Sequence, residues 1–360
     1  MVTRYIDFNR GDDSNDGSIS APWKNLTKID DAAYTAGDAF LLADDSVWEY
    51  DLATRVLPPA TWTGTRDNPV VIGKYSPLSA SAGTLPTIRW NRRIQANEWT
   101  WSEANNAWTY TSPFNVGFLA LVRIAGTWES SRTDAGLPLA SIDGRYHAAG
   151  TTFYLWAPSN TNPTDYYGEV LLGIAGAGFF SISNNRRFVR IEDIRFENTG
   201  CGVFGYSDTA ADVGIDVRRL QGEIVSGLVI ANTVGTLGQL YARISGLEVR
   251  NWGAAVVQGI ASNGAGFREF DVSYCRIFDG LHSHSQGAIY NQVRTAGLRP
   301  RIHHNYFDGV RWGTRDKEQD GCAIYCETGS DASLIEYNVI RNAYCALQDG
   351  SGRSQTFRHN

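Results

Sequence analysis

Two short stretches of the sequence concentrate side chains that can transfer protons or neutralise charge. The first reads LHSHSQ (residues 281–286) and the second reads RWGTRDKEQDG (residues 311–321). Histidine, lysine and carboxylate groups act as general acids and bases, and arginine pairs with anionic groups. The side chains that could carry catalysis are Lys317, Arg315, Arg311, His284, His282, Glu318, Asp320 and Glu327. The alternative is that both stretches are ordinary solvated loops, so the elements that position them matter.

A repeat of strand-like sequence surrounds both stretches. From Phe188 onward, segments align on an apolar residue at position 0, inward-facing residues at +3 and +5, and Asn or Asp at +7. The frames begin at Ile191, Val225, Ile244, Val272, Ile302, Ile335 and Phe357. Polar and apolar residues alternate within a frame, as a half-exposed strand requires. The spacing between frames varies while the strand core stays constant, which predicts a solenoid of stacked coils with its insertions in loops.

A second strand follows the Asn or Asp of most frames. Its central apolar residue, which a small residue precedes, is Val203, Val256, Ile289, Ile324 or Leu347. The residue after it is predicted to point outward, so that a partly aromatic wall forms across the coils. The candidates for binding a ligand are Tyr290, Tyr325, Gln348, Asp349 and, on another face, His304. Because both charged stretches leave the same corner of neighbouring coils, they are predicted to meet beside this wall.

The asparagines and cysteines predict features of the interior. Asn305, Asn338 and Asn360 occupy position +3 in three consecutive frames, which predicts an internal ladder of amide hydrogen bonds. The five cysteines include no C-x-x-C pair, which argues against a disulfide framework and against a zinc ribbon. They are predicted to be buried thiols, although Cys322 and Cys345 would be stacked neighbours that a disulfide could join.

Composition favours a β-rich fold with many turns. The chain has 360 residues, of which 42% are hydrophobic and 19% charged, with abundant Gly, Trp, Tyr and Phe. A net charge of -6 argues against a nucleic-acid partner. No apolar run is long enough to cross a membrane, and the first residues lack the apolar segment of a signal peptide. We expect an N-terminal cap and first coils over 1–90, including a helix at Leu26–Thr35, then a Trp/Tyr-rich β-meander and irregular coils over 91–187, and regular coils over 188–360 that end inside a coil.

The first half of the chain resembles a known family. The order GDDSNDGSISAPWKNL, AGDAFLLADDSVW, NPVVIGKY and FYLWAPSNTNP is similar to the N-terminal portion of right-handed parallel β-helix proteins of the pectate-lyase-like superfamily. RIHHNYF (residues 301–307) also resembles a histidine-containing stretch of pectate lyases. The superfamily contains polysaccharide lyases, glycoside hydrolases and bacteriophage tailspike depolymerases. With the repeat, the resemblance implies an all-β fold: a single-stranded right-handed parallel β-helix with an N-terminal cap and a β-meander insertion.

The resemblance implies a polysaccharide depolymerase that acts outside the cell or on a virion and cleaves a bacterial or algal glycan. β-Elimination of a uronate-containing polymer is slightly favoured, with Lys317 or His284 as the base and Arg311 or Arg315 neutralising the uronate. The expected cofactor is none or Ca²⁺, and the metal ligands would be Asp316, Glu318 and Asp320. A second acidic stretch, DDSNDG (residues 12–17), opens like a calcium loop, but Trp23 stands where such a loop has glutamate.

Two other functions stay open at this point. A glycoside hydrolase would use two carboxylates on opposite sides of the scissile bond, drawn from Asp316, Glu318, Asp320, Glu327 and Asp349. A carbohydrate-binding or structural tailspike protein would need no catalytic group. The expected partner in every case is a polysaccharide, with no nucleic acid and no membrane, and the tailspike resemblance leaves assembly as a homotrimer open.

Overall fold

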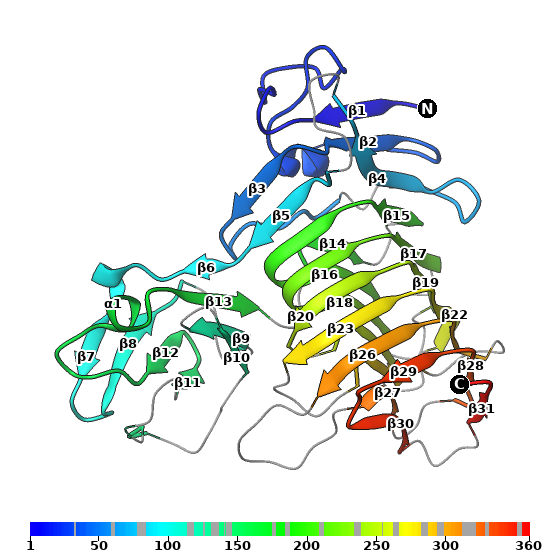
Figure 1. Cartoon of the computed structure of the whole chain (residues 1–360). Helices are drawn as coiled ribbons and strands as arrows, with labels where there is room; N and C mark the ends of the chain where they lie inside the picture. The colour runs from blue at the N-terminus through cyan, green and yellow to red at the C-terminus, as the bar shows by residue number, and fades with distance from the viewer. Residues whose placement is uncertain are drawn as a thin grey trace.

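Parallel strands stacked in coils form the body of the molecule in the computed structural model, and a smaller antiparallel part projects from one side (Figure 1). The structure describes residues 1–31, 34–58, 62–77, 84–113, 119–124, 127–130, 137–139, 141, 146–174, 178–183, 188–208, 212–233, 239–253, 255–261, 266–281, 287–293, 299–311, 322–327, 331–350 and 355–360. Side chains are described for all of these except residues 31, 119–124, 127–130, 174, 224, 226, 281 and 311.

One ladder of the solenoid is a parallel sheet to which each coil contributes one short strand. Its order is β1 (Thr3–Ile6), β2 (Ala39–Ala43), β4 (Val70–Tyr75), β15 (Val189–Glu192), β17 (Asp212–Arg218), β19 (Gln239–Ser245), β22 (Gly266–Ser273), β25 (Arg301–His303), β28 (Leu334–Glu336) and β31 (Thr356–Arg358). Every neighbouring pair in it is parallel. The sheet therefore follows the axis of the solenoid from the N-terminal cap to the last coil.

The remaining solenoid strands form a second sheet with two limbs. The first limb holds β3 (Val47–Tyr50), β5 (Thr87–Trp90), the beginnings of β16 (Arg195–Ser207) and β18 (Gln221–Thr233), β20 (Glu248–Trp252), β23 (Arg276–Leu281), β26 (Tyr306–Arg311) and β29 (Val339–Arg341). The second limb holds β14 (Phe180–Ser183), the ends of β16 and β18, β21 (Val257–Ala261), β24 (Ile289–Gln292), β27 (Cys322–Cys326) and β30 (Cys345–Asp349). The long strands β16 and β18 run through both limbs and so join them. The predicted all-β parallel β-helix is confirmed.

Strand pairing fixes the true register of the coils. It aligns Ile191, Val217, Ile244, Val272, Ile302, Ile335 and Phe357. The predicted frame at Val225 is therefore wrong, because Val225 pairs with Thr199 and Trp252 in the middle of a long strand. In the second limb, Val257 and not Val256 stands opposite Ile289. In both cases a second apolar residue fits the same alternation: Val225 lies on the strand after that of Val217, and Val256 directly precedes Val257.

Each coil turns sharply two residues after its aligned apolar residue. The backbone there is left-handed, with φ of 57° at Asp193, 50° at Arg219, 65° at Gly246, 56° at Tyr274, 56° at His304, 55° at Tyr337 and 54° at His359. A second left-handed position, such as Asn251 at 52° or Asp279 at 51°, ends the first limb. Asn, Asp, His and Gly adopt this conformation most easily, which accounts for most of the residue types at these bends.

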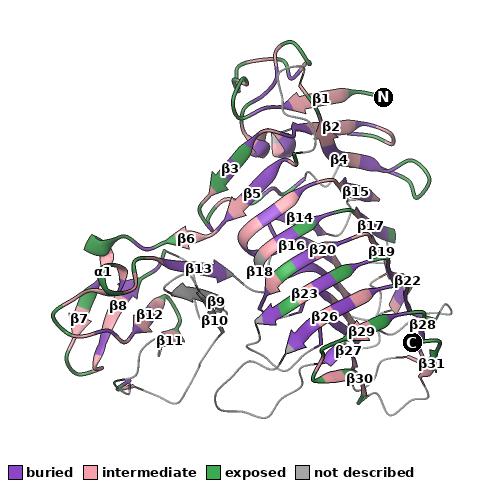
Figure 2. Cartoon of the chain, viewed as in Figure 1, coloured by how far each residue is buried: buried purple, intermediate pink, exposed green. Residues whose placement is uncertain are grey.

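The interior is apolar in most coils and contains an amide ladder in the last ones. Side chains alternate between buried and exposed along the solenoid strands (Figure 2). Asn305 Nδ2 donates to Asn338 Oδ1 at 3.0 Å, and Asn338 Nδ2 donates to Asn360 Oδ1 at 2.9 Å. The predicted ladder is confirmed. All five cysteines are free and four are buried, and burial raises the pKa of the thiols of Cys201 and Cys275 to about 12.

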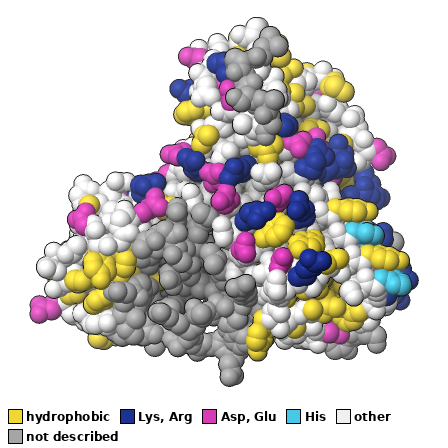
Figure 3. Space-filling model, in the orientation of Figure 1, with side chains coloured by type: hydrophobic (Ala, Val, Ile, Leu, Met, Phe, Trp, Pro, Cys, Tyr) yellow, Lys and Arg dark blue, Asp and Glu magenta, His cyan; other side chains and the backbone are white. Residues whose placement is uncertain are grey.

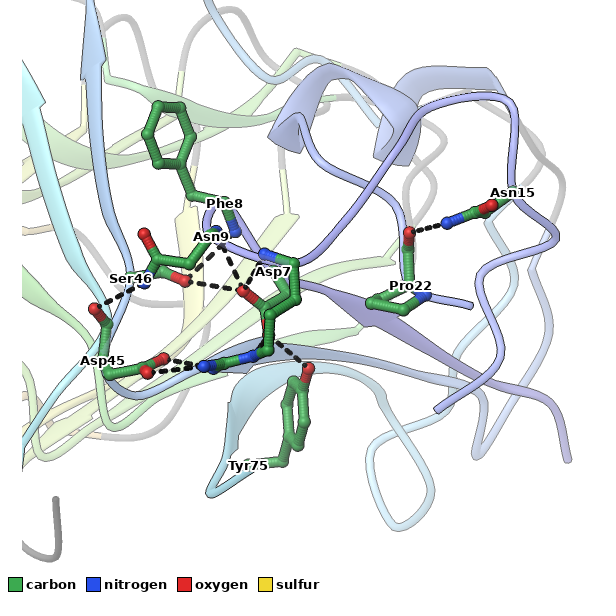
Figure 4. A network of polar contacts seen from close by, with 9 residues as sticks. Asp7, Phe8, Asn9, Asn15, Pro22, Asp45, Ser46 and Tyr75 are labelled. Atoms are coloured by element: carbon green, nitrogen blue, oxygen red, sulfur yellow. Dashed lines mark hydrogen bonds and ion pairs between the residues drawn. The ribbon is translucent and has the colours of Figure 1, made fainter. Parts of the chain in front are cut away.

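The N-terminal cap is held by a buried carboxylate. Asp7 accepts hydrogen bonds from the backbone and Nε of Arg10 and lies beside Ser46 and Tyr75, while Arg10 forms a bidentate pair with Asp45 (Figure 4). The helix expected at Leu26–Thr35 is instead a short 3₁₀ helix, η1 (Leu26–Asp31). In the acidic loop of residues 12–17, the carboxylates accept hydrogen bonds from backbone amides. Asp12 and Asp16 accept from amides two residues further along, and Asp13 accepts from the amides of residues 24 and 25.

The projecting part consists of two antiparallel sheets. One contains β10 (Thr127–Ser130), β9 (Leu119–Ile124), β13 (Val170–Ile174) and β6 (Arg92–Arg93), and the other contains β11 (Tyr146–Ala149), β12 (Thr152–Leu155), β8 (Ala107–Thr111) and β7 (Thr100–Ser102). Two short helices accompany them, η2 (Ala96–Glu98) and α1 (Pro163–Tyr167). No helix in the part of the chain that the structure describes is long and apolar enough to cross a membrane.

Candidate active site and outer faces of the solenoid

Most of the predicted catalytic side chains lie outside the described residues. These are His282, His284, Arg315, Lys317, Glu318 and Asp320, as well as Asp316 of the predicted metal site and the side chain of Arg311. The strands that lead into the two charged stretches are nevertheless in register, since Leu281 at the end of β23 pairs with Arg311 at the end of β26. The strands that follow them are also neighbours, with Ile289 opposite Ile324. Both stretches thus leave and rejoin the solenoid side by side, as the repeat predicted.

The predicted aromatic wall is present on the second limb. Tyr290 on β24 pairs with Tyr325 on β27, and their ring centroids are 5.8 Å apart. Gln348 continues the same outward column on β30, and Gln258 continues it in the opposite direction. Tyr290 is only 6% exposed, so most of its ring is packed against neighbours. The wall therefore offers Tyr325 and Gln348 to a ligand more than it offers Tyr290.

Glu327 and Asp349 are the predicted catalytic carboxylates whose side chains the structure describes. Glu327 follows β27 directly, is half-buried, and its backbone amide donates to the carbonyl of Asn291 at 2.9 Å. Desolvation first, and then the charge of Glu327, raise the pKa of the Tyr290 phenol to about 12. The backbone hydrogen bond to Asn291 places Glu327 beside the tyrosine wall, at the end of β27 opposite to the point where the second charged stretch rejoins the solenoid.

Two predicted ligand-binding residues lie elsewhere. Asp349 pairs with Cys326, one position beyond the column of Tyr325 and Gln348, and its side chain is exposed on the last coil. The sequence pattern did not separate it from its neighbour Gln348, which occupies that column. His304 lies before β26, at the end of that strand opposite to the second charged stretch. The structure therefore does not bring these two residues together with Tyr290 and Tyr325.

His304 belongs to an aromatic stack along the first bend of the coils. Its ring stacks between Tyr274 at 5.1 Å and Tyr337 at 5.0 Å, and Tyr337 stacks on His359 at 4.9 Å. His304 Nδ1 lies 2.9 Å from His303 Nδ1, and His303 Nε2 lies 3.2 Å from Asp271 Oδ2. The rings support one another along the bends, while Tyr274 and Tyr337 remain 61% and 46% exposed.

A second outer surface, on the first limb, was not predicted. Three guanidinium groups lie over two aromatic rings: Arg250 Cζ at 4.3 Å and Arg276 Cζ at 5.5 Å from the centroid of Phe278, and Arg341 Cζ at 5.8 Å from that of Tyr306. We call these five residues the arginine–aromatic strip. Figure 3 shows basic side chains gathered around hydrophobic ones on this face. The sequence signal was the outward positions +4 and +6 of each frame, but the contacts join different coils and so are not visible in any one of them.

The same face has a different character in the earlier coils. Arg89 bridges Glu49 at 2.7 Å and Glu197 at 2.9 Å, and Arg195 pairs with Glu197 at 2.9 Å and with Glu223. We call this chain of contacts the ion-pair ladder. A polar hollow of about 260 Å³ adjoins it, lined by residues of β3, β5 and β6 and the beginning of β16. Among the described residues, no group of three or more His, Cys, Asp or Glu side chains is arranged to hold a metal ion.

Comparisons with known proteins find only low similarity. No family model and no curated protein matches the chain. Among solved structures, a GH136 lacto-N-biosidase from Eubacterium ramulus aligns with a TM-score of 0.47 and 15% identity, over 99% of this chain and 56% of that one. The complex of XylC with xylose aligns with a TM-score of 0.46 and 10% identity, over 94% of this chain and 66% of that one. A tailspike of Pseudomonas phage phi297 aligns with a TM-score of 0.20 and 9% identity, over 86% of this chain and 67% of that one. The chain spans less than two thirds of the first two proteins, and its fold rests on its own strand pairing.

Proposed function

We propose that this protein cleaves a carbohydrate polymer on the outside of the second limb, on the face between the two charged stretches and Glu327. The observation that supports this most directly is the position of Glu327. Its half-buried carboxylate follows Tyr325 by two positions beside the Tyr290 and Tyr325 wall, and the charged stretches join the other end of the same strands, β24 and β27. An elongated solenoid face suits an elongated polymer, and aromatic side chains provide surfaces for sugar rings.

The reaction proposed is hydrolysis of a glycosidic bond. In this mechanism Glu327 supplies one of the two carboxylates, and its partner is drawn from Asp316, Glu318 or Asp320 of the second stretch, which joins the other end of β27. One carboxyl group protonates the leaving oxygen, and the other activates water or attacks the anomeric carbon. The β-elimination hypothesis, which uses Lys317 or His284 as the base, depends wholly on side chains outside the described residues, and so does the proposal of bound Ca²⁺.

One assay separates the three functions. The full chain is incubated with a panel of neutral and acidic polysaccharides, with and without a chelator, while reducing ends and the ultraviolet absorbance of unsaturated products are followed together. Hydrolysis yields reducing ends alone, and elimination yields both signals. Neither signal on any substrate would contradict enzymatic cleavage and leave the carbohydrate-binding role.

Glu327→Gln tests the assignment of the carboxylate. We expect a loss of activity of at least about 100-fold, since a proton-transfer group contributes 10²–10⁴-fold. Glu192→Gln, a carboxylate of the ten-stranded sheet paired with Arg219, is the matched control and is expected to keep full activity. As a readout independent of activity, Glu327→Gln should lower the pKa of Tyr290 from about 12, measured by tyrosinate absorbance. Full activity of Glu327→Gln would refute the assignment.

A further inference from the structure

The arginine–aromatic strip is set apart by how loosely its positive charges are compensated. Arg250 lies 3.4 Å and Arg276 lies 3.8 Å from the single carboxylate of Glu248, and all three of these side chains are at least 36% exposed. The other nearby carboxylate, Asp308, accepts from Tyr306 Oη at 3.1 Å and from Asn342 Nδ2 at 2.7 Å. The strip thus holds three arginines against Glu248 and Asp308, while Glu223, the cross-strand neighbour of Arg250, is paired with Arg195.

The rings orient the arginines without using their hydrogen-bonding edges. A guanidinium group that lies over an aromatic ring interacts through its flat face, so the N–H groups around its edge stay available. Phe278 and Tyr306 are half-buried and lie 5.8 Å apart, which gives the arginines a fixed support. A planar fork of N–H donors fits the two oxygens of a carboxylate or sulfate better than it fits a neutral hydroxyl group.

The spacing of the charges follows the stacking of the coils. Arg250, Arg276 and Arg341 come from β20, β23 and β29, and β26 with Tyr306 lies between the last two. Adjacent strands are about 4.8 Å apart, so the cations recur at intervals of roughly 5–10 Å along the solenoid axis. A polymer with a repeating negative charge can pair with several of them at once. The strip also lies on β23 and β26, the strands that lead into the two charged stretches.

We propose that the arginine–aromatic strip is a binding site for an anionic polysaccharide, whose carboxylate or sulfate groups pair with Arg250, Arg276 and Arg341. This names the substrate class of the proposed glycan-cleaving function and rests on that function for the carbohydrate nature of the ligand. The strip would hold the polymer across the first limb, and the polymer would continue past the charged stretches onto the second limb, where cleavage is proposed.

The test is equilibrium binding of the full chain to three probes: oligogalacturonate, sulfated dextran oligosaccharides and neutral dextran. We expect at least one anionic probe to bind and neutral dextran not to bind, with affinity falling as salt is raised. Arg276→Ala and Arg341→Ala should each weaken binding about 10-fold, because a charge-assisted hydrogen bond is lost. Arg276→Lys should recover part of the affinity, since it keeps the charge and loses the fork.

Arg195→Ala is the matched control, because it lies on the same face but is held by two glutamates in the ion-pair ladder. It should leave the affinity unchanged, and circular dichroism of every variant checks the fold. Equal weakening by Arg195→Ala, or equal binding of a single-stranded oligonucleotide, would overturn the proposal in favour of a general electrostatic effect. Binding of anionic probes without cleavage of any glycan would contradict the proposed cleavage and support the proposed binding site. Cleavage of a neutral glycan without binding of the anionic probes would support the proposed cleavage and contradict the proposed binding site.

Discussion

The early and late coils of the solenoid differ in the partners of their outward arginines and in their interior residues. On β5 and β16 the outward arginines are tied into the ion-pair ladder, and the interior position three residues after the aligned residue is apolar, as at Leu220. From β20 onward the outward arginines lie on aromatic rings, and the same interior position changes from Leu247 and Cys275 to Asn305 and Asn338 in the last coils. The first arrangement satisfies its charges internally, whereas the second leaves positive charge at the surface. We therefore place the proposed binding surface on the late coils.

Removal of an interior amide should have the largest effect. Asn338 accepts from the backbone amide and Nδ2 of Asn305 and donates to the carbonyl of Ile302 and to Asn360. Asn338→Leu leaves buried polar groups without partners, and we expect a loss of about 3 kcal/mol in the free energy of unfolding. Urea denaturation measures it.

The converse substitution, which replaces an apolar interior residue of an early coil by asparagine, tests whether the interiors of the early and late coils are specialised. Leu220→Asn places an amide between Ile194 and Leu247, both fully buried and apolar, and should also destabilise the protein by about 3 kcal/mol. If either variant were as stable as the wild-type protein, the contrast between the two interiors would have no energetic basis.

Phe278→Ala should have the next largest effect, about 2 kcal/mol of stability, because a half-buried ring and its two cation–π contacts are lost. Phe278→Leu keeps most of the volume and should lose about 1 kcal/mol. Thermal unfolding of the two variants separates packing from the cation–π contribution. Identical stability of Phe278→Leu and the wild-type protein would show that the arginines gain nothing from the ring.

Breaking the ion-pair ladder should lower the stability of the protein by a smaller amount. Glu197→Gln removes the carboxylate shared by Arg89 and Arg195 and is expected to destabilise the protein by about 1 kcal/mol. The difference from the wild-type protein should shrink at high salt, because salt screens the exposed part of the ladder. A difference that does not depend on salt would mean that the glutamate acts through packing and not through charge.

The smallest expected effect is on the pH dependence of stability, through Asp308. Its hydrogen bonds, first with Asn342 and then with Tyr306, lower the pKa of this carboxyl below its usual 3.8. The stabilisation is therefore fully present above pH 3.8 and is lost as the pH falls through the folded-state pKa. Asp308→Asn should lack this acid-dependent loss, so its stability relative to the wild-type protein should improve below pH 3.8. A constant difference at all pH values would contradict the assignment.

Local pattern was sufficient for the features that repeat in every coil. The alternation of apolar and polar residues identified the solenoid, the asparagines at a constant position identified the ladder, and the two insertions were assigned to one corner. These succeed because stacked coils place equivalent positions on top of one another, so a periodicity in the sequence becomes a column in space. The buried thiols follow from the same register.

The predictions failed where more than one residue fits the same pattern. Val225 on β18 and Val217 on β17 both fit it, and only pairing with the neighbouring coils selects Val217. Asp349 lies one position beyond the column of Tyr325 and Gln348 and pairs with Cys326. Such errors are expected because a shift of one residue in a strand moves every side chain to the other face.

The sequence by itself determined that this chain forms a parallel β-helix, that its last coils contain an asparagine ladder, and that its charged insertions emerge together. Only the tertiary structure decided that Glu327 lies beside Tyr290, that His304 belongs to a separate stack, and that three arginines from different coils gather over Phe278 and Tyr306. The physical reason is that strand periodicity is encoded locally, whereas contacts between coils depend on register and on turns that bring distant segments side by side.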